Sequence, residues 1–246
     1  MISGLYSAAT AMDATNRRHE VAAENLANLQ IPGYRRRILA QSSFDAVMKP
    51  MQPQQDGAHS SNLLGATTGQ TQYDFTQGHI EETKLKLDVA LNGEGFFTVQ
   101  GPEGPLYTRN GAFHIDPQGT LVNVDGFPVQ GTGGPIRLPG GVTSSQIEIA
   151  IDGSIYAGDQ QIGQLALAQF ADNSVLTATG ASLFTASPDA VTTGSSAEVL
   201  QGRLEMANTS SVNELVNIIA ISRHRDAAQK ALNTIAESIQ KRIGLR

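Results

Sequence analysis

Hydrophobic positions near the start of the chain recur at alternating spacings of three and four residues. This spacing is typical of an amphipathic helix with a narrow apolar seam, and it predicts a helix over residues 3–29. The seam consists of Leu5, Ala8, Met12, Thr15, His19, Ala22, Leu26 and Leu29. Pro32 and Gly33 then end the helix, because Pro32 cannot donate a backbone hydrogen bond and Pro-Gly suits a type II turn.

The same spacing returns at the other end of the chain and predicts a helix over residues 208–243. Its seam consists of Val212, Leu215, Ile219 and Ser222, followed by Ala228, Leu232, Ile235 and Ile239. A narrow seam cannot bury itself, and most helix stability in proteins comes from packing an apolar face. We therefore expect the two end segments to pack on each other or on copies of themselves.

Between the helices the apolar period changes to two. Leu87, Val89 and Leu91 alternate with polar or small residues, Asn92-Gly93 marks a turn, and Phe96–Val99 resumes as a strand. Further glycine turns follow, which indicates antiparallel hairpins. Residues 49–72 are rich in Pro, Gln and small polar residues and indicate an extended arm or linker.

These patterns predict an α+β protein in which N- and C-terminal helices form a discontinuous coiled-coil-like domain with an inserted all-β antiparallel domain. The expected boundaries are 1–34 for the first helix and turn, 35–74 for the arm, 75–206 for the β-rich domain and 207–246 for the last helix.

Charge is distributed unevenly along the 246 residues, which carry a net charge of −6. Residues 1–37 contain five basic and three acidic residues, and residues 206–246 contain six and three, whereas residues 81–205 contain five and fourteen. Basic ends and an acidic middle suit contacts between unlike parts of neighbouring subunits. Solvated faces without a partner are an equally good interpretation.

Candidate chemistry is sparse. The chain has no cysteine, which excludes disulfides and thiolate sites. The five histidines form no metal-ligand spacing, and no nucleotide loop or nucleophile elbow occurs. Arg35-Arg36-Arg37 is too short a basic run in an acidic protein to indicate nucleic-acid binding. We therefore expect no catalytic, cofactor-binding or metal site, no nucleic-acid partner and no enzyme activity.

The first twelve residues lack the basic and apolar regions of a signal peptide, and no apolar run approaches the roughly 20 residues of a transmembrane helix. We therefore expect a chain that does not span a membrane and that leaves the cytoplasm, if at all, without a cleaved leader.

Several segments together resemble the flagellar basal-body rod and hook protein family. They are Gly4–Ala9, Glu24–Leu29, Pro32–Arg36, Leu87–Phe97, Tyr107–Phe113, Gly119–Val122, Asp125-Gly126, Gly202–Glu205 with Asn208, and Asn213–Leu215 with Arg223. They cover both ends and the middle in the order that the family has. His224 and Arg225, where the family usually has an aromatic residue, and Asn208-Thr209-Ser210 depart from its pattern.

The resemblance implies a non-catalytic axial subunit of the periplasmic rod, the drive shaft of flagellar motility. It implies export through the flagellar type III apparatus, and copies of itself and neighbouring rod or hook proteins as partners. Gly134–Pro139, Gly163–Leu165, Phe170–Asp172 and Leu183-Phe184 favour the proximal rod member over the distal one.

Two sets of site residues follow. The assembly interface is predicted at Leu5, Met12, Leu26, Leu29, Leu215, Ile219, Leu232, Ile235 and Ile239, shared between packing within and between chains. The structural signature is predicted at Asn25, Asn28, Pro32, Gly33, Tyr34, Asp88, Gly93, Gly95, Phe96, Phe97, Tyr107, Thr108, Arg109, Gly111 and Phe113. The alternative from another class is a secreted β-domain binding module on a helical stalk, and an enzyme is the third interpretation.

Overall fold

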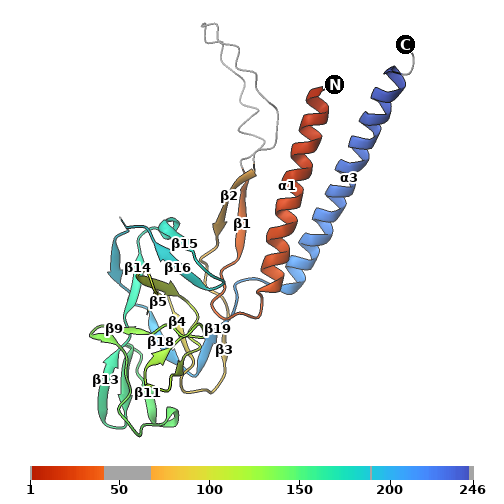
Figure 1. The fold of residues 1–246 in the computed structure, drawn as a ribbon. Coiled ribbons are helices and arrows are strands. Elements are labelled where there is room, and N and C mark those ends of the chain that lie inside the picture. The colour runs from red at the N-terminus through yellow and green to blue at the C-terminus, as the bar shows by residue number, and fades with distance from the viewer. Residues whose placement is uncertain (1, 42–67, 189, 244–246) are drawn as a thin grey trace. The chain divides into compact units, whose positions relative to one another are not determined.

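The computed structural model describes residues 2–41, 68–188 and 190–243, which are grouped in two compact units (Figure 1). The helical unit comprises the described residues of 1–27, 37–73 and 211–246. The β unit comprises residues 28–36 and the described residues of 74–210. The chain therefore passes from one unit to the other four times, and each unit is assembled from segments that are far apart in the sequence.

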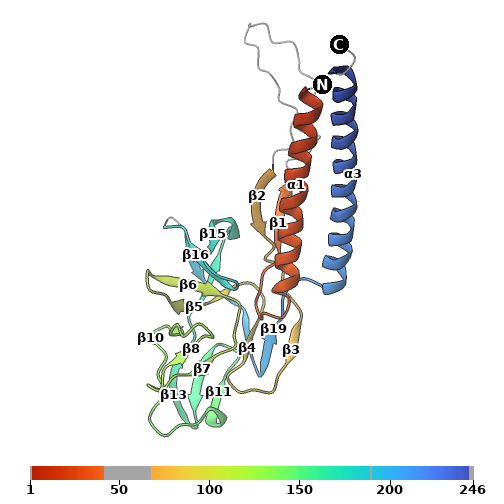
Figure 2. The same cartoon turned by 45° about the vertical axis from the view of Figure 1, so that its right-hand side comes forward.

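The helical unit contains α1 (Ile2–Ala27) and α3 (Ser211–Ile243), which lie side by side (Figure 2). It also contains β1 (Arg37–Gln41) and β2 (Thr68–Tyr73), which pair antiparallel with a bulge between Leu39 and Gln41. Strand β1 also contacts α1. The two strands lie in the segment that the sequence predicts as an extended arm, and residues 42–67 of that segment lie outside the described residues.

Helix α3 buries a different face at its start from the one that the sequence predicts. Glu214 and Ile221 are buried, and Ile218, Arg225, Ala228 and Leu232 are partly buried, which is a seven-residue repeat. Of the predicted seam, Val212, Leu215 and Ile219 are exposed. The seam is therefore displaced by one residue in the first half of the helix, and the predicted and observed faces coincide at Ala228 and Leu232.

The β unit is built around a six-stranded sheet in which all paired neighbours are antiparallel. In order across the sheet, the strands are β15 (Leu176–Ala178), β16 (Leu183–Ala186), β6 (Pro105–Thr108), β5 (Phe96–Gln100), β14 (Leu167–Phe170) and β17 (Thr192–Gly194).

Smaller antiparallel sheets surround it. A three-stranded sheet contains β11 (Ile147–Ile149), β12 (Ser154–Ala157) and β13 (Gln160–Gln164). The two-stranded pairs are β3 (Ile80–Glu82) with β19 (Arg203–Glu205), β4 (Val89–Asn92) with β18 (Glu198–Gln201), β7 (His114–Ile115) with β8 (Leu121–Val122), and β9 (Gln130–Gly131) with β10 (Gly134–Pro135). Pairs β3–β19 and β4–β18 join the start of the unit to its end.

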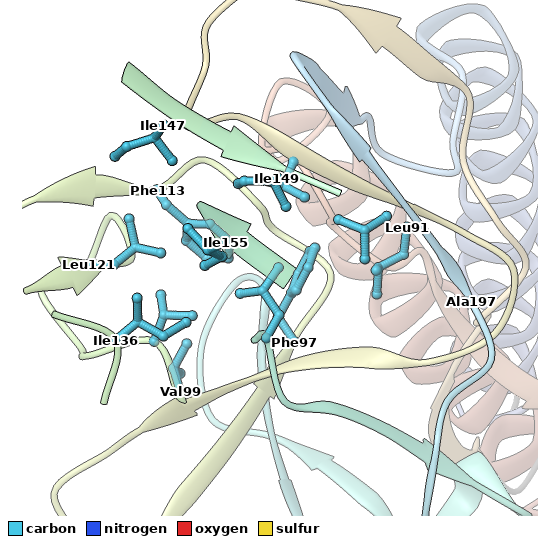
Figure 3. Close-up of a cluster of buried hydrophobic side chains, with 14 of the residues drawn as sticks. Leu91, Phe97, Val99, Phe113, Leu121, Ile136, Ile147, Ile149, Ile155 and Ala197 are labelled. Carbon is cyan, nitrogen blue, oxygen red and sulfur yellow. The ribbon is translucent and has the colours of Figure 1, made fainter. Parts of the chain in front are cut away.

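Consecutive phenylalanines in β5 serve two different clusters, because successive side chains of a strand point to opposite faces. Phe97 is fully buried in an aliphatic core and meets Phe113 edge-on, with ring centroids 5.2 Å apart (Figure 3). Phe96 packs instead against the rings of Phe75, Phe170 and Phe184, at centroid distances of 5.8–6.3 Å. Both faces of the central strand are thus covered by side chains.

The predicted fold class is wrong. The described structure is mostly β-sheet, with α1 and α3 as the α-helices of the described residues, and it is not a coiled-coil-like helical domain carrying an inserted β domain. A helical period identifies which segments are helices, but it does not show that a β hairpin joins them in one unit. Nor does it show that residues 28–36, which follow the first helix, belong to the β unit.

Within the described residues, neither helix has a stretch long and apolar enough to cross a membrane.

Candidate functional site

The most buried charged group of the β unit is the carboxylate of Glu205, at the end of β19, which is 0% exposed. Its Oε1 accepts a hydrogen bond from Nη2 of Arg35 at 2.8 Å and from the backbone N–H of Gly78 at 2.8 Å. Its Oε2 accepts one from Nη1 of Arg109 at 3.1 Å. This ion cluster brings together residues 35, 109 and 205, which lie in three distant parts of the sequence.

The two arginines are anchored by backbone carbonyls as well. Arg35 donates to the carbonyl of Thr76 at 2.8 Å, and Arg109 donates to the carbonyl of Gly93 at 2.7 Å. The guanidinium of Arg109 also lies over the ring of Phe96, 5.4 Å from its centroid. Because these groups fix the position of both cations, the cluster joins the turn at Gly93 to the chain that follows α1.

Two cations share one anion in this cluster, so it carries an excess positive charge in a buried place. Burial lowers the pKa of Arg109 to about 10; the charge of Glu205 opposes this shift, and the charge of Arg35 adds to it. The guanidinium of Arg109 therefore remains protonated at neutral pH. Removing the single carboxylate would leave two buried cations without their counter-ion, which is the costly way to break such a cluster.

Gly33 allows the chain to pass close to the Arg109-Asn110 backbone. Its φ of +70° is in the left-handed region, and a Cβ at this position would lie 2.3 Å from the backbone N of Asn110. The N–H of Gly33 donates to the backbone carbonyl of Glu205 at 2.7 Å. Tyr34, which follows, is 2% exposed. Gly33 and Tyr34 thus place Arg35 beside Glu205, while Pro32 is partly buried.

Asn208 ties together three backbone segments of the β unit. Its Oδ1 accepts from the N–H of Arg36 at 2.7 Å, and its Nδ2 donates to the carbonyls of Asp74 at 2.7 Å and Thr76 at 3.0 Å. Each of these segments lies next to a point where the chain passes between units. The side chain therefore links those segments within the β unit.

In the helical unit, the side chain of Asn25 likewise links two backbone segments, the end of α1 and the start of β1. It is 1% exposed, its Oδ1 accepts from the N–H of Arg37, and its Nδ2 donates to the carbonyl of Arg37, both at 2.9 Å. Glu24 forms an ion pair with the side chain of Arg37, whose guanidinium lies 5.7 Å from the centroid of the Tyr73 ring. These contacts fix the start of β1 against the end of α1. Asn28 follows α1 and is partly buried.

The remaining signature residues shape the β unit around the cluster. A Cβ on Gly111 would lie 1.7 Å from the carbonyl oxygen of Val89, and Gly93 and Gly95 have φ values of +114° and +145°. Thr108 is 0% exposed, donates to the carbonyl of Ser182 at 2.7 Å and accepts from the N–H of Asn110. Asp88 and Tyr107 are also buried.

The predicted interface residues fall into three groups according to the burial of their side chains. Met12 and Leu26 on α1, Leu29 after it, and Leu232 on α3 are partly buried. Leu215 and Ile219 are exposed. The side chains of Leu5, Ile235 and Ile239 lie outside the part of the chain whose side chains the structure describes.

Sequence reasoning did not single out Glu205, Arg35 or Asn208 as site residues, although all three lie in segments that resemble the rod family. No spacing or period connects residue 35 with residue 205, because their contact depends on the pairing of β3 with β19. A charged residue at the end of a strand is usually solvated, so burial of Glu205 has no local signal. Among the described residues, no group of three or more metal-ligating side chains occurs.

Replacing Glu205 with alanine is expected to destabilise the β unit by about 3–5 kcal/mol, because it leaves Arg35 and Arg109 buried without an anion. Urea unfolding followed by far-UV circular dichroism measures the change. Glu148→Ala is the matched control, since Glu148 is an exposed strand residue and should change stability by less than about 0.5 kcal/mol. Equal effects of the two substitutions would contradict a structural role for the cluster.

Comparing Gly33→Ala with Gly126→Ala separates two contributions to the loss of stability, the steric clash of a new Cβ and the cost of a left-handed backbone conformation. Gly126 also has a positive φ, +82°, but a Cβ added there would have no other atom within 4 Å. Gly126→Ala should therefore cost only the left-handed conformation, about 1–2 kcal/mol, whereas Gly33→Ala should lose a further ~1–3 kcal/mol through the clash with Asn110. The same urea experiment measures both, and equal losses would show that the contact with Asn110 relaxes freely.

Comparison with known proteins shows that this chain is similar to flagellar proteins. Residues 90–157 match the flagellar hook protein FlgE/F/G D1 domain, and residues 200–245 match the flagellar basal body rod FlgEFG protein C-terminal domain. The second match contains Glu205 and Asn208, and the first contains Arg109.

Similarity to individual relatives extends over nearly the whole chain. The flagellar basal-body rod protein FlgG of Buchnera aphidicola from Acyrthosiphon pisum is 32% identical, over 98% of each chain. FlgG of Agrobacterium fabrum is 33% identical over 94% of each chain. The flagellar basal-body rod protein FlgF of Salmonella typhimurium is 31% identical over 97% of this chain and 96% of its own. The chain with the Glu205 ion cluster therefore belongs to the flagellar basal-body rod protein family.

Proposed function

We propose that this chain is an axial structural subunit of the flagellar basal-body rod and that its position is the proximal part of the rod. The observation that carries the proposal is the extent of the similarity, which covers 98% of this chain and of a rod protein. It includes both terminal helices as well as the β unit. A binding module that shared only a β domain with rod proteins would not show this extent.

Polymerisation is the activity that the surface of the helical unit supports. Helix α3 buries one face toward α1 and still exposes Val212, Leu215, Val216 and Ile219. Exposed apolar side chains at helical spacing are stabilised by packing against another chain. The partners that we propose are further copies of this chain and neighbouring rod or hook proteins. The interface includes Leu215 and Ile219 of the predicted set.

The β unit supports a structural role for its buried charges. Both oxygens of Glu205 accept hydrogen bonds, from Arg35, Arg109 and Gly78. The carboxylate therefore holds separate segments of the β unit together. We assign the chain no reaction. We further propose that it reaches the periplasmic rod through the flagellar type III export apparatus, without a cleaved leader.

The proximal position rests on sequence features, above all Gly134–Pro139 and Leu183-Phe184, that resemble the proximal rod protein FlgF. The distal rod protein FlgG is the second candidate, because FlgG chains are 32% and 33% identical to this chain and a FlgF chain is 31% identical. The percentages do not separate the two positions, whereas a deletion experiment does.

Deleting the gene should abolish swimming, and expressing the chain from a plasmid should restore it. Basal bodies purified from the deletion strain and imaged by electron microscopy distinguish the two positions. If subunits add in order from the inner membrane outward, loss of a proximal subunit stops the rod near its base. Loss of a distal subunit leaves a short rod.

Intact rods and normal swimming in the deletion strain would contradict the proposed function. They would favour the secreted binding module instead. A short rod that ends beyond the proximal segment would assign the chain to the distal position and leave its structural role unchanged.

A further inference from the structure

Helix α3 carries two separate stripes on opposite sides. The first, in which Glu214 and Arg225 accompany Ile218, Ile221 and Ala228, is wholly or partly buried in the helical unit. The second, which we call the outer stripe, comprises Val212, Leu215, Val216 and Ile219, with exposed fractions of 66%, 49%, 62% and 55%. At about 100° per residue, the centres of the two stripes lie about 150° apart around the helix.

A pair of helices uses only one stripe on each helix. Two opposite stripes are expected of a helix that lies between two neighbours. One neighbour of α3 is α1 of the same chain. The outer stripe is on the other side of α3, so α1 of the same chain does not cover it in the described structure, which leaves it available to a second neighbour.

The exposed side of α1 matches the outer stripe in shape and charge. Its exposed described residues include Ala9, Asp13, Asn16, Glu20, Ala23 and Ala27 on one face, with Arg17 at the edge of that face. None of the large exposed apolar residues of the described structure lies on α1, so this side allows a neighbouring helix to approach closely. Its two acidic residues are seven residues apart and therefore lie on one face.

Charges beyond the outer stripe have the opposite sign at the same spacing. Arg223 follows Val216 by seven residues, and Lys230 follows it by fourteen, and both are exposed. Going backward from Ala27 on α1, Glu20 is seven residues away and Asp13 is fourteen. An antiparallel register that sets Ala27 opposite Val216 therefore also sets Glu20 opposite Arg223 and Asp13 opposite Lys230. Asp13 already forms an ion pair with Arg17 of its own helix, at 3.2 Å.

We propose that the outer stripe of α3 packs antiparallel against the exposed side of α1 from a second copy of this chain, in the register Ala27–Val216, Glu20–Arg223. This inference rests on the proposed function and names the surfaces through which the subunit polymerises. The two surfaces are different, so the contact is heterologous. Repeating it adds copies in one direction and does not close a pair, as a rod requires.

Charge reversal tests the register in a strain that lacks the native gene. Glu20→Arg and Arg223→Glu should each reduce the swimming radius several-fold, because each places like charges opposite one another. The double variant should restore swimming toward the wild-type value. Asn213→Asp is the control, since Asn213 is exposed on α3 outside both stripes, and it should swim normally. Full swimming of both single variants, or no recovery in the double variant, would overturn the register.

Disulfide formation tests the contact directly, because the native chain has no cysteine. The variant with both Ala27→Cys and Val216→Cys should give dimers and higher oligomers of this chain when basal bodies are oxidised and analysed on a non-reducing gel. Each single-cysteine variant should remain monomeric. Dimers from Val216→Cys alone would show that outer stripes pair with each other and would refute the proposal.

The two experiments separate this inference from the proposed function. A wild-type copy that fails to restore swimming to the deletion strain would contradict the proposed function. A double-cysteine strain that swims but gives only monomer would leave the rod function intact and overturn the heterologous contact. If the double-cysteine strain does not swim, the charge-reversal result decides.

Discussion

Glu205 joins parts of the β unit that the sequence keeps far apart. Its carboxylate binds Arg35, Arg109 and the backbone of Gly78, and its own backbone carbonyl accepts from Gly33. A buried carboxylate is tolerated only with such partners, so each of these segments must be in place for the others to be stable. The turn after α1, the turn at Gly93 and the end of the β unit therefore depend on one anion.

Local patterns in the sequence identify much of the secondary structure. The apolar alternation at Leu87–Leu91 and the strand predicted at Phe96–Val99 correspond to β4 and β5, and the terminal periods correspond to α1 and α3. The register of α3 was not predictable in its first half, because Val212, Leu215 and Ile219 form a seam as regular as the one that is buried. A helix with two apolar stripes gives two valid interpretations of a single pattern, and only the packing partner decides between them.

The residues that form the ion cluster were harder to predict from the sequence. Arg109 and Gly33 belong to segments that resemble the rod family, but their shared partner, Glu205, is more than two hundred residues from the start of the chain. The hairpin of β1 and β2 has the same difficulty, since Arg37 pairs with Tyr73 across a long intervening segment. Contacts of this kind are set by topology, and a one-dimensional pattern carries no information about them. Glycines were the exception. Where another backbone segment must pass close to the chain, as at Gly33 and Gly111, only glycine fits, so the residue type itself indicates the contact.

The pairing of the first strands of the β unit with its last strands also bears on the order in which the molecule can form. Strand β3 pairs with β19 and β4 pairs with β18, so the sheet ends are joined across more than one hundred residues. Contacts this distant delay folding, because a long loop must close before they form. If the chain emerges from a narrow conduit with its N-terminus first, these strands stay unpaired until residue 205 is released. Delivery and folding then become successive events.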